Sequence, residues 1–137
     1  MNNRYIFRGK RKDNKEWVEG DLIQWKNGNV QICLGVGTNK EQKTLVDVIP
    51  ETVGQCTGLK DKNSKLIFEG DIIRTKEYGR VIAHSTVSDY DIFRITYVPA
   101  MFRIENIHRA FNLVGNSADC EVIGNIHDNP ELFEVEK

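Results

Sequence analysis

The scarcity of cysteine is the first constraint on this protein. Only Cys33, Cys56 and Cys120 occur among 137 residues, and no two of them form a CxxC pair. The sequence therefore lacks the signature of a zinc ribbon and of a secreted disulfide framework, and it predicts small buried thiols in a reducing cytoplasm. No run of about eighteen apolar residues is present, so no membrane span is expected. No long apolar run follows the first charged residues, so no signal peptide is expected.

An excess of positive charge and a helical repeat of apolar residues are also absent. Lys and Arg (19) are balanced by Asp and Glu (20), for a net charge of −1. Proteins that hold duplex DNA through its phosphates usually carry a basic excess instead. Apolar residues do not follow a helical period over three turns but alternate in short segments, such as 30–34 and 92–98, which is typical of strands.

The clearest feature that is present is a segment that occurs twice. Residues 17–23 read Trp-Val-Glu-Gly-Asp-Leu-Ile, and residues 67–73, 50 positions later, read Ile-Phe-Glu-Gly-Asp-Ile-Ile. The polar turns before the two copies also match, with Lys12, Asn14 and Lys15 against Lys62, Ser64 and Lys65. Because glycine accommodates a positive φ, we expect Gly20 and Gly70 to be structural residues that make the same sharp bend into a strand.

These patterns predict an all-β fold, a small barrel-like folded sheet of many short strands with an internal pseudo-repeat and a short C-terminal helical turn. One domain is expected over residues 1–137, with repeat units at about 9–26 and about 59–76.

Turn residues locate three local features within this fold. Asn27-Gly28 predicts a tight hairpin, and Tyr78-Gly79 predicts another between strands at 71–76 and 80–84. The C-terminal helical turn is predicted by Asn129, which can cap a helix, and by Pro130, which suits the first helical position.

Several stretches of the sequence carry a resemblance to a known family. They are 7–10 with 20–22, then 52–61, 67–72, and 121–126 with 129–132. In this order they resemble the YopX family, small proteins found mostly in phages and prophages of bacteria. The resemblance implies a phage-derived, soluble, β-rich protein of the bacterial host cytoplasm that self-associates, and it supplies no activity. Cys56 stands where an aromatic residue is common in the family and Ser64 where glycine is common, and the first departure weighs against a nucleophilic role for Cys56.

Basic residues around one turn are the main candidates for binding. Arg8, Lys10, Arg11, Lys12 and Lys15 concentrate positive charge there, and Trp17 is close by. Basic groups beside an aromatic ring can hold single-stranded nucleic acid through phosphate contacts and stacking. The alternative is a solvated turn with Trp17 in the core, and nearby glutamates dilute the positive field.

A polar groove is the second candidate. Gln55 and Thr57 alternate along one strand, so they share a face opposite Cys56, and Arg74 follows the second glycine bend. Together these three polar side chains would line a groove. The alternative is that they form hydrogen bonds to neighbouring strands.

Residues of catalytic type occur in patterns that favour structural roles. The acid pairs Glu19/Asp21 and Glu69/Asp71 flank the two glycines, and acids at such turns usually accept hydrogen bonds from nearby backbone N–H groups. His84, His108 and His127 lack the short spacing of a metal site, and Cys56 lacks the flanking signature of a nucleophile. Residues 35–40 lack the Gly-Lys-Ser/Thr ending of a phosphate loop. We expect no catalytic residues, no metal and no cofactor.

The sequence therefore predicts a non-enzymatic accessory protein that forms a homo-oligomer and binds a macromolecular partner, such as a host or phage protein. Two alternatives are a single-stranded nucleic-acid-binding protein that uses the basic turn 8–15 and a small hydrolase that joins Asp or Glu to His or Cys in a polar pocket. No association with a membrane is expected.

Overall fold

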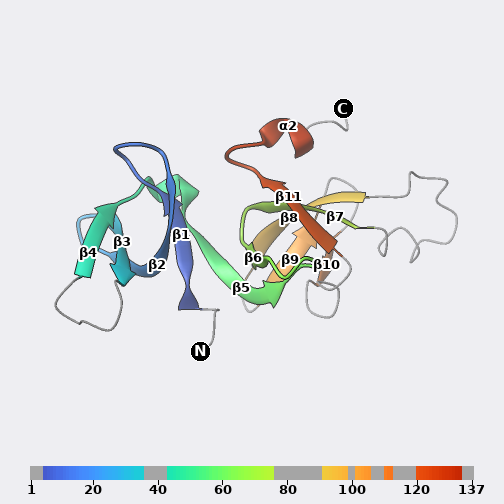
Figure 1. The fold of residues 1–137 in the computed structure, drawn as a ribbon, viewed down its shortest axis with the longest axis horizontal. Helices are drawn as coiled ribbons and strands as arrows, with labels where there is room; N and C mark the ends of the chain where they lie inside the picture. Colours follow the sequence, from blue (N-terminus) through green and yellow to red (C-terminus); the bar gives the residue numbers. More distant parts are fainter. Residues whose placement is uncertain are drawn as a thin grey trace, which may run out of the picture. The chain divides into compact units, whose positions relative to one another are not determined.

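Antiparallel strands make up most of the computed structural model, which describes residues 5–35, 43–75, 91–98, 101–105, 110–112 and 120–133 (Figure 1). The chain divides into two compact units, Met1–Cys56 (unit 1) and Thr57–Lys137 (unit 2). One copy of the repeated segment lies in each unit. The all-β prediction is confirmed, although in the described part of the chain no ladder joins the end strands of a sheet, so the two sheets are open.

Unit 1 is a meander of antiparallel strands. Its strands are β1 (Phe7–Lys10), β2 (Trp17–Gln24), β3 (Val30–Gly35), β4 (Lys43–Asp47) and the start of β5 (Gly54–Lys60), in the order β4-β3-β2-β1-β5. Residues of even number from β2 and β3 face inward and form a core centred on Ile32 and Val48, both fully buried. The alternation of apolar residues along these strands therefore places one face inside and one face in solvent.

The tight hairpin predicted at Asn27-Gly28 is confirmed. Gly28 has a φ of 94°, and the N–H of Trp25 donates to the carbonyl of Asn29 at 2.8 Å. The hairpin joins β2 to β3, with Gln24 opposite Val30. Glycine suits this position because a positive φ strains any other side chain.

The segment after β4 curls the sheet of unit 1 back towards β1. Val48 forms an isolated bridge with Arg11 at the end of β1, and the N–H of Ile49 donates to the carbonyl of Lys10 at 2.8 Å. A Cβ at Gly9 would lie 3.1 Å from Val48, so glycine allows this close approach. A 3₁₀ turn, η2 (Pro50–Thr52), then leads into β5.

Unit 2 contains the rest of β5 and a five-stranded sheet. After β6 (Leu66–Phe68) come β7 (Asp71–Thr75), β8 (Asp91–Val98), β9 (Met101–Glu105), β10 (Ala110–Asn112) and β11 (Cys120–Asn125), and the sheet order is β10-β9-β8-β7-β11. Its core contains Ile67, Ile73, Phe93 and Ile95, each no more than 1% exposed. Of the three thiols that were predicted to be buried, Cys56 and Cys120 are fully buried, whereas Cys33 is only half-buried.

The prediction that the strand at 71–76 pairs with residues 80–84 is wrong. Strand β7 pairs on one side with β8, where Ile73 lies opposite Phe93, and on the other with β11, where Ile73 lies opposite Val122. Both edges of β7 are therefore occupied. Residues 80–84 and the expected turn at Tyr78-Gly79 lie outside the described residues. Local turn residues indicated a nearby partner, but the stronger apolar alternation of β8 supplied a more distant one.

The two glycines of the repeat have unlike conformations, which corrects the expected common bend. Gly70 has a φ of 93° and forms a turn between β6 and β7, whereas Gly20 continues within β2 without a positive φ. A Cβ at Gly20 would lie 2.1 Å from the carbonyl oxygen of Cys33 on β3. Gly20 is therefore required by the close approach of a neighbouring strand, and Gly70 by its backbone conformation.

The polar turns before the two copies do behave alike. The N–H of Lys12 donates to the carbonyl of Asp47 at 3.0 Å, and the N–H of Lys62 donates to the carbonyl of Cys120 at 2.9 Å. Strands β4 and β11, which these turns cover, each stand at the end of a sheet. Each polar turn therefore occupies part of an exposed strand edge, which would otherwise be open to another chain.

The C-terminal helical turn is confirmed as α2 (Pro130–Phe133), which begins with proline. Asn129 stands directly before Pro130, where its carbonyl accepts the N–H of Leu132 at 3.0 Å, while its Oδ1 accepts a hydrogen bond from the N–H of Asn125 at 3.2 Å. It thereby fixes the turn between β11 and α2. Within the described ranges, no helix is long and apolar enough to cross a membrane.

Candidate functional site

The basic residues of β1 gather on the ring of Trp17, as the sequence placed them. Lys10 lies opposite Trp17 in the β1–β2 register, and Arg8 is two residues away on the same face. The guanidinium of Arg8 lies 4.8 Å from the centre of the Trp17 ring, and the Nζ of Lys10 lies 5.5 Å from it. These are cation–π contacts within the chain, so the ring already has positive groups of the protein over it.

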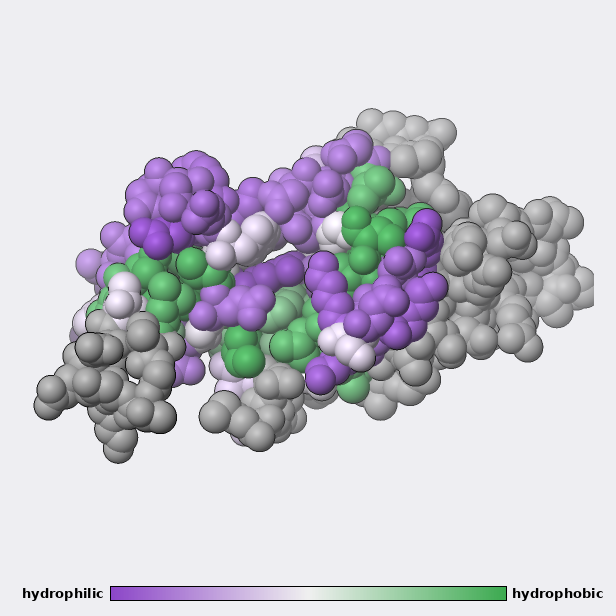
Figure 2. Space-filling model, viewed as in Figure 1, coloured by the Kyte–Doolittle hydropathy of each residue, from purple (hydrophilic) through white to green (hydrophobic). Residues whose placement is uncertain are grey.

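The rest of the basic turn is a hydrophilic cluster at the end of β1 (Figure 2). Arg11 donates from Nε and Nη2 to the two carboxylate oxygens of Asp13, at 2.9 and 2.8 Å. This hydrogen-bonded pair lowers the pKa of Asp13 and raises that of Arg11. Much of the positive charge predicted at Arg11 is therefore balanced locally, and Lys12 and Lys15 remain as exposed cations of this turn.

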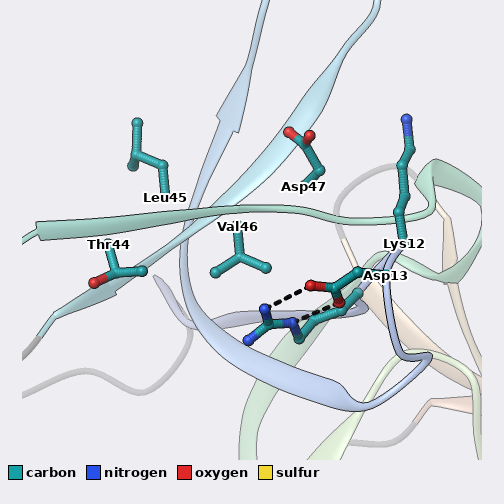
Figure 3. A pocket seen from close by; sticks show the side chains of 7 residues that line it. Lys12, Asp13, Thr44, Leu45, Val46 and Asp47 are labelled. Atoms are coloured by element: carbon teal, nitrogen blue, oxygen red, sulfur yellow. Dashed lines mark hydrogen bonds and ion pairs between the residues drawn. The ribbon is translucent and has the colours of Figure 1, made fainter.

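A shallow groove of about 230 Å³ runs between this turn and β4. Its lining consists of Arg11, Lys12, Asp13, Thr44, Leu45, Val46 and Asp47. Figure 3 shows Leu45 and Asp47 on one side of β4 and Thr44 and Val46 on the other, where the ion pair of the turn lies. The groove is small and polar at one wall, so it suits the side chains of a partner better than an enclosed small molecule.

The outer face of β2, β3 and β4 carries a surface that the sequence reading missed. Ile23, Gln31 and Asp47 form one row across the three strands, and Asp21, Cys33 and Leu45 form the next. Directly opposite residues project from the same face, so these side chains share the surface away from the core. We call this surface the outer face of unit 1, together with Trp25 at its end.

Trp25 is held in place on this outer face although it is 49% exposed. Its Nε1 donates to Oε1 of Gln31 at 2.7 Å, and Nε2 of Gln31 donates to Oδ1 of Asp47 at 2.9 Å. Leu45, on the same face, is 45% exposed. An exposed tryptophan held in one orientation is the kind of side chain that is enriched at the centre of protein interfaces.

The residues of the predicted groove, Gln55, Thr57 and Arg74, are divided between the two units. Gln55 lies in unit 1, opposite Phe7, whereas Thr57 and Arg74 lie in unit 2. Thr57 is buried, and its hydroxyl accepts a hydrogen bond from the N–H of Leu59 at 3.1 Å. Thr57 therefore matches the alternative of local hydrogen bonding, and the groove itself stays a prediction.

Arg74 belongs instead to a row of arginines on one face of the sheet in unit 2. It donates to Oε1 of Glu121 on β11 at 2.6 and 3.1 Å. On β8 and β9, Arg94 and Arg103 share the carboxylate of Glu105, at 2.9 and 2.5 Å. We call Arg74, Arg94 and Arg103 the arginine stripe.

Both glutamates of this face stay ionised to low pH. The hydrogen bonds from Arg74 lower the pKa of Glu121. Burial raises the pKa of Glu105, but the hydrogen bonds from Arg103 and Arg94 outweigh it and the net pKa is lowered.

The chain matches the family model described as YopX protein over residues 6–134. It belongs to the YopX family. Among solved structures it is similar to the crystal structure of protein EF1440 from Enterococcus faecalis, with 26% identity, a TM-score of 0.55, and coverage of 93% of this chain and 96% of that one. No curated protein matches the chain. The family resemblance read from the sequence is thereby confirmed.

In this YopX-family chain, the acids of the repeat lie in unlike settings. Asp71 is 1% exposed, and its Oδ2 accepts the N–H of Phe68 at 2.7 Å, as expected of an acid at a turn. Glu19 and Asp21 lie on β2 as exposed strand residues, where Glu19 is opposite Arg8 and Asp21 is opposite Cys33.

The remaining candidates for chemistry of this YopX-family chain are not assembled in the described part. No three His, Cys, Asp or Glu residues within it come together as a metal site would require. His127 lies in the turn after β11, where its N–H donates to Oδ1 of Asn125 at 3.0 Å. His84 and His108 lie outside the described residues. Cys56 is fully buried, in keeping with its interpretation as a core thiol.

Proposed function

We propose that this YopX-family chain is a non-enzymatic accessory protein of phage origin that acts in the bacterial cytoplasm, self-associates and binds a macromolecular partner. Family membership supports a phage origin, because the YopX family consists of small proteins found mostly in phages and prophages of bacteria. The observation that carries the binding function is the oriented, half-exposed Trp25, which Gln31 and Asp47 hold on the same face of the sheet as the exposed Leu45. An exposed tryptophan with a fixed side chain loses little entropy when a partner covers it.

The charges of unit 1 favour a second copy of the chain as the partner that binds this outer face. Asp21 and Asp47 give the face a negative rim, while Lys12 and Lys15 give the neighbouring polar turn exposed positive charge. Two different patches of opposite charge on one chain are complementary between copies, and such head-to-tail contacts build rings or filaments. The strand edges contribute less, because Lys12 and Lys62 already cover parts of them.

Light scattering during size-exclusion chromatography tests self-association directly. We expect an oligomer for the natural chain and a shift towards monomer for Trp25→Ala. Tyr97→Ala is the matched control, because Tyr97 is similarly exposed, at 51%, but lies in unit 2. A natural chain that stays monomeric at high concentration would overturn self-association, and an equal shift for Tyr97→Ala would remove the outer face as its site.

The structure supports the nucleic-acid alternative at the basic turn less well. Cations of the chain already lie over the ring of Trp17, and Arg11 is paired with Asp13. That alternative predicts that a Lys10/Arg11/Lys12→Ala triple variant loses binding to a single-stranded oligonucleotide. Unchanged affinity in that variant would exclude the turn as the binding site. The hydrolase alternative also stays a prediction, and its buried acid Asp71 is engaged with the backbone of Phe68.

A further inference from the structure

The arginine stripe of unit 2 crosses three neighbouring strands on a single face. Arg94 on β8 lies opposite Ile72 on β7 and opposite Glu105 on β9, and Arg74 and Arg103 are each two residues from these positions. Residues two apart on a strand share a face, so all three arginines project from the side opposite Phe93 and Ile95. Their spacing is that of diagonal neighbours, about 7–8 Å from strand to strand.

Cations outnumber carboxylates among the described groups of the arginine stripe and its ion pairs. Lys62 lies 4.0 Å from Glu121, so among the described residues the ion pairs of this face join four cations to the two carboxylates of Glu105 and Glu121, while Asp61 adds a third carboxylate near Glu121. The side chains of Arg74 and Arg94 are each 42% exposed and that of Arg103 is 34% exposed. Although the whole chain has a net charge of −1, this face is therefore locally basic.

The glutamates also fix the direction of the guanidinium groups. Arg74 and Arg94 each bind one carboxylate oxygen through Nε and Nη2, which holds the planar fork in one orientation. Arg103 Nε and Thr96 Oγ1, on opposed positions of β9 and β8, are shielded from solvent and have no hydrogen-bond partner among the described residues. The face therefore presents the guanidinium groups of Arg74 and Arg94 in fixed orientations.

We propose that the arginine stripe binds the phosphate backbone of a single-stranded nucleic acid. This inference rests on the proposed function, because it names the class of macromolecular partner. A line of separate guanidinium groups suits a flexible polyanion, whose successive phosphates can each meet one arginine. Arginine matches phosphate through paired N–H groups. The sequence placed nucleic-acid binding at the turn of unit 1, whereas the ion-paired face of unit 2 offers the more ordered set of cations.

Fluorescence anisotropy with a labelled oligothymidylate of 20 nucleotides tests the proposal at several salt concentrations. Three phosphate contacts predict that log K falls with log salt with a slope of about −2. We expect the Arg74/Arg94/Arg103→Gln triple variant to bind at least about tenfold more weakly with a flattened slope. The matched control is Lys10/Lys12→Gln in the turn of unit 1, which should bind as the natural chain does.

Two further variants keep the proposal falsifiable if the triple Gln variant fails to fold. Glu105→Gln/Glu121→Gln removes negative charge from the face and should tighten binding, and an Arg→Lys triple variant should keep the salt slope. No binding by the natural chain at 50 mM salt, or equal loss in the Lys10/Lys12 control, would overturn the proposal. Equally strong binding of a labelled polyglutamate peptide would replace nucleic acid with an acidic protein partner. Light scattering of the same samples separates a loss of self-association from a loss of binding.

Discussion

Lys12 and Lys62, fifty positions apart in the sequence, make the same backbone contact in separate units. Each donates its N–H to an outward-facing carbonyl of a strand at the end of a sheet, Lys12 to Asp47 and Lys62 to Cys120. The polar turn of each repeat is thus a cover for an exposed edge. Edge strands without such covers are open to pairing with other chains.

Proline at either lysine should destabilise the protein and expose the edge. Lys12→Pro and Lys62→Pro each remove the donating N–H, so we expect a loss of about 1–3 kcal/mol in the free energy of unfolding by urea, with faster aggregation. Lys12→Ala and Lys62→Ala keep the N–H and should stay within about 0.5 kcal/mol of the natural chain. Alanine variants as unstable as the proline variants would show that the lysine side chains, not the edge contacts, matter.

Gly20 and Gly28 should respond differently to the same substitution. A Cβ at Gly20 would lie 2.1 Å from the carbonyl of Cys33, which requires the two strands to separate, whereas a Cβ at Gly28 meets nothing within 4 Å. We expect Gly20→Ala to cost about 3 kcal/mol or more. Gly28→Ala should cost about 1 kcal/mol, because only its positive φ is strained. Chemical denaturation measures both, and equal losses would contradict the close approach of β2 and β3.

Asp61 should make stability depend on pH in the acid range. Its carboxylate is buried, which raises the pKa, but hydrogen bonds from the N–H groups of Val122, Lys65 and Asn63 outweigh burial, so the net pKa is lowered. A lowered folded-state pKa gives stability that is present above the unfolded-state pKa and is lost as pH falls through the folded value.

The Asp61→Asn variant isolates this effect. It should be about 1–3 kcal/mol less stable than the natural chain at neutral pH, and the difference should shrink as pH falls below about 4. Glu51→Gln, at an exposed position in η2, is the control and should change stability by no more than about 0.5 kcal/mol. A difference that stays constant down to pH of about 2 would remove the charge of Asp61 as the cause.

The expectation of one domain over residues 1–137 predicts one cooperative unfolding transition. Strand β5 begins in unit 1 and ends in unit 2, so its hydrogen bonds belong to both. We expect the calorimetric and van't Hoff enthalpies to agree. Two separate transitions would instead show that Met1–Cys56 and Thr57–Lys137 fold independently.

Local chemistry explains which parts of the fold were predictable. Asn27-Gly28 determines its hairpin through the φ of a single residue, and Pro130 marks a helix start for the same kind of local reason. The partner of β7 was not predictable in this way, because pairing with β8 and β11 depends on residues far along the chain. The same distinction applies to the two candidate surfaces of unit 1, of which only the basic one was predictable from the sequence. The sequence placed Arg8 and Lys10 near Trp17, but the hydrogen bonds from Trp25 through Gln31 to Asp47 join the hairpin turn after β2 to β3 and β4.

The sequence by itself determined an all-β chain of the YopX family, with polar turns, a tight hairpin and two copies of one motif, because each of these depends on residues that are neighbours along the chain. Only the tertiary structure decided that the copies differ. Gly20 accommodates a strand that arrives from elsewhere, whereas Gly70 turns the chain itself. Strand register likewise brought Arg74, Arg94 and Arg103 onto one face, since a cross-strand neighbour is set by pairing and not by distance along the sequence.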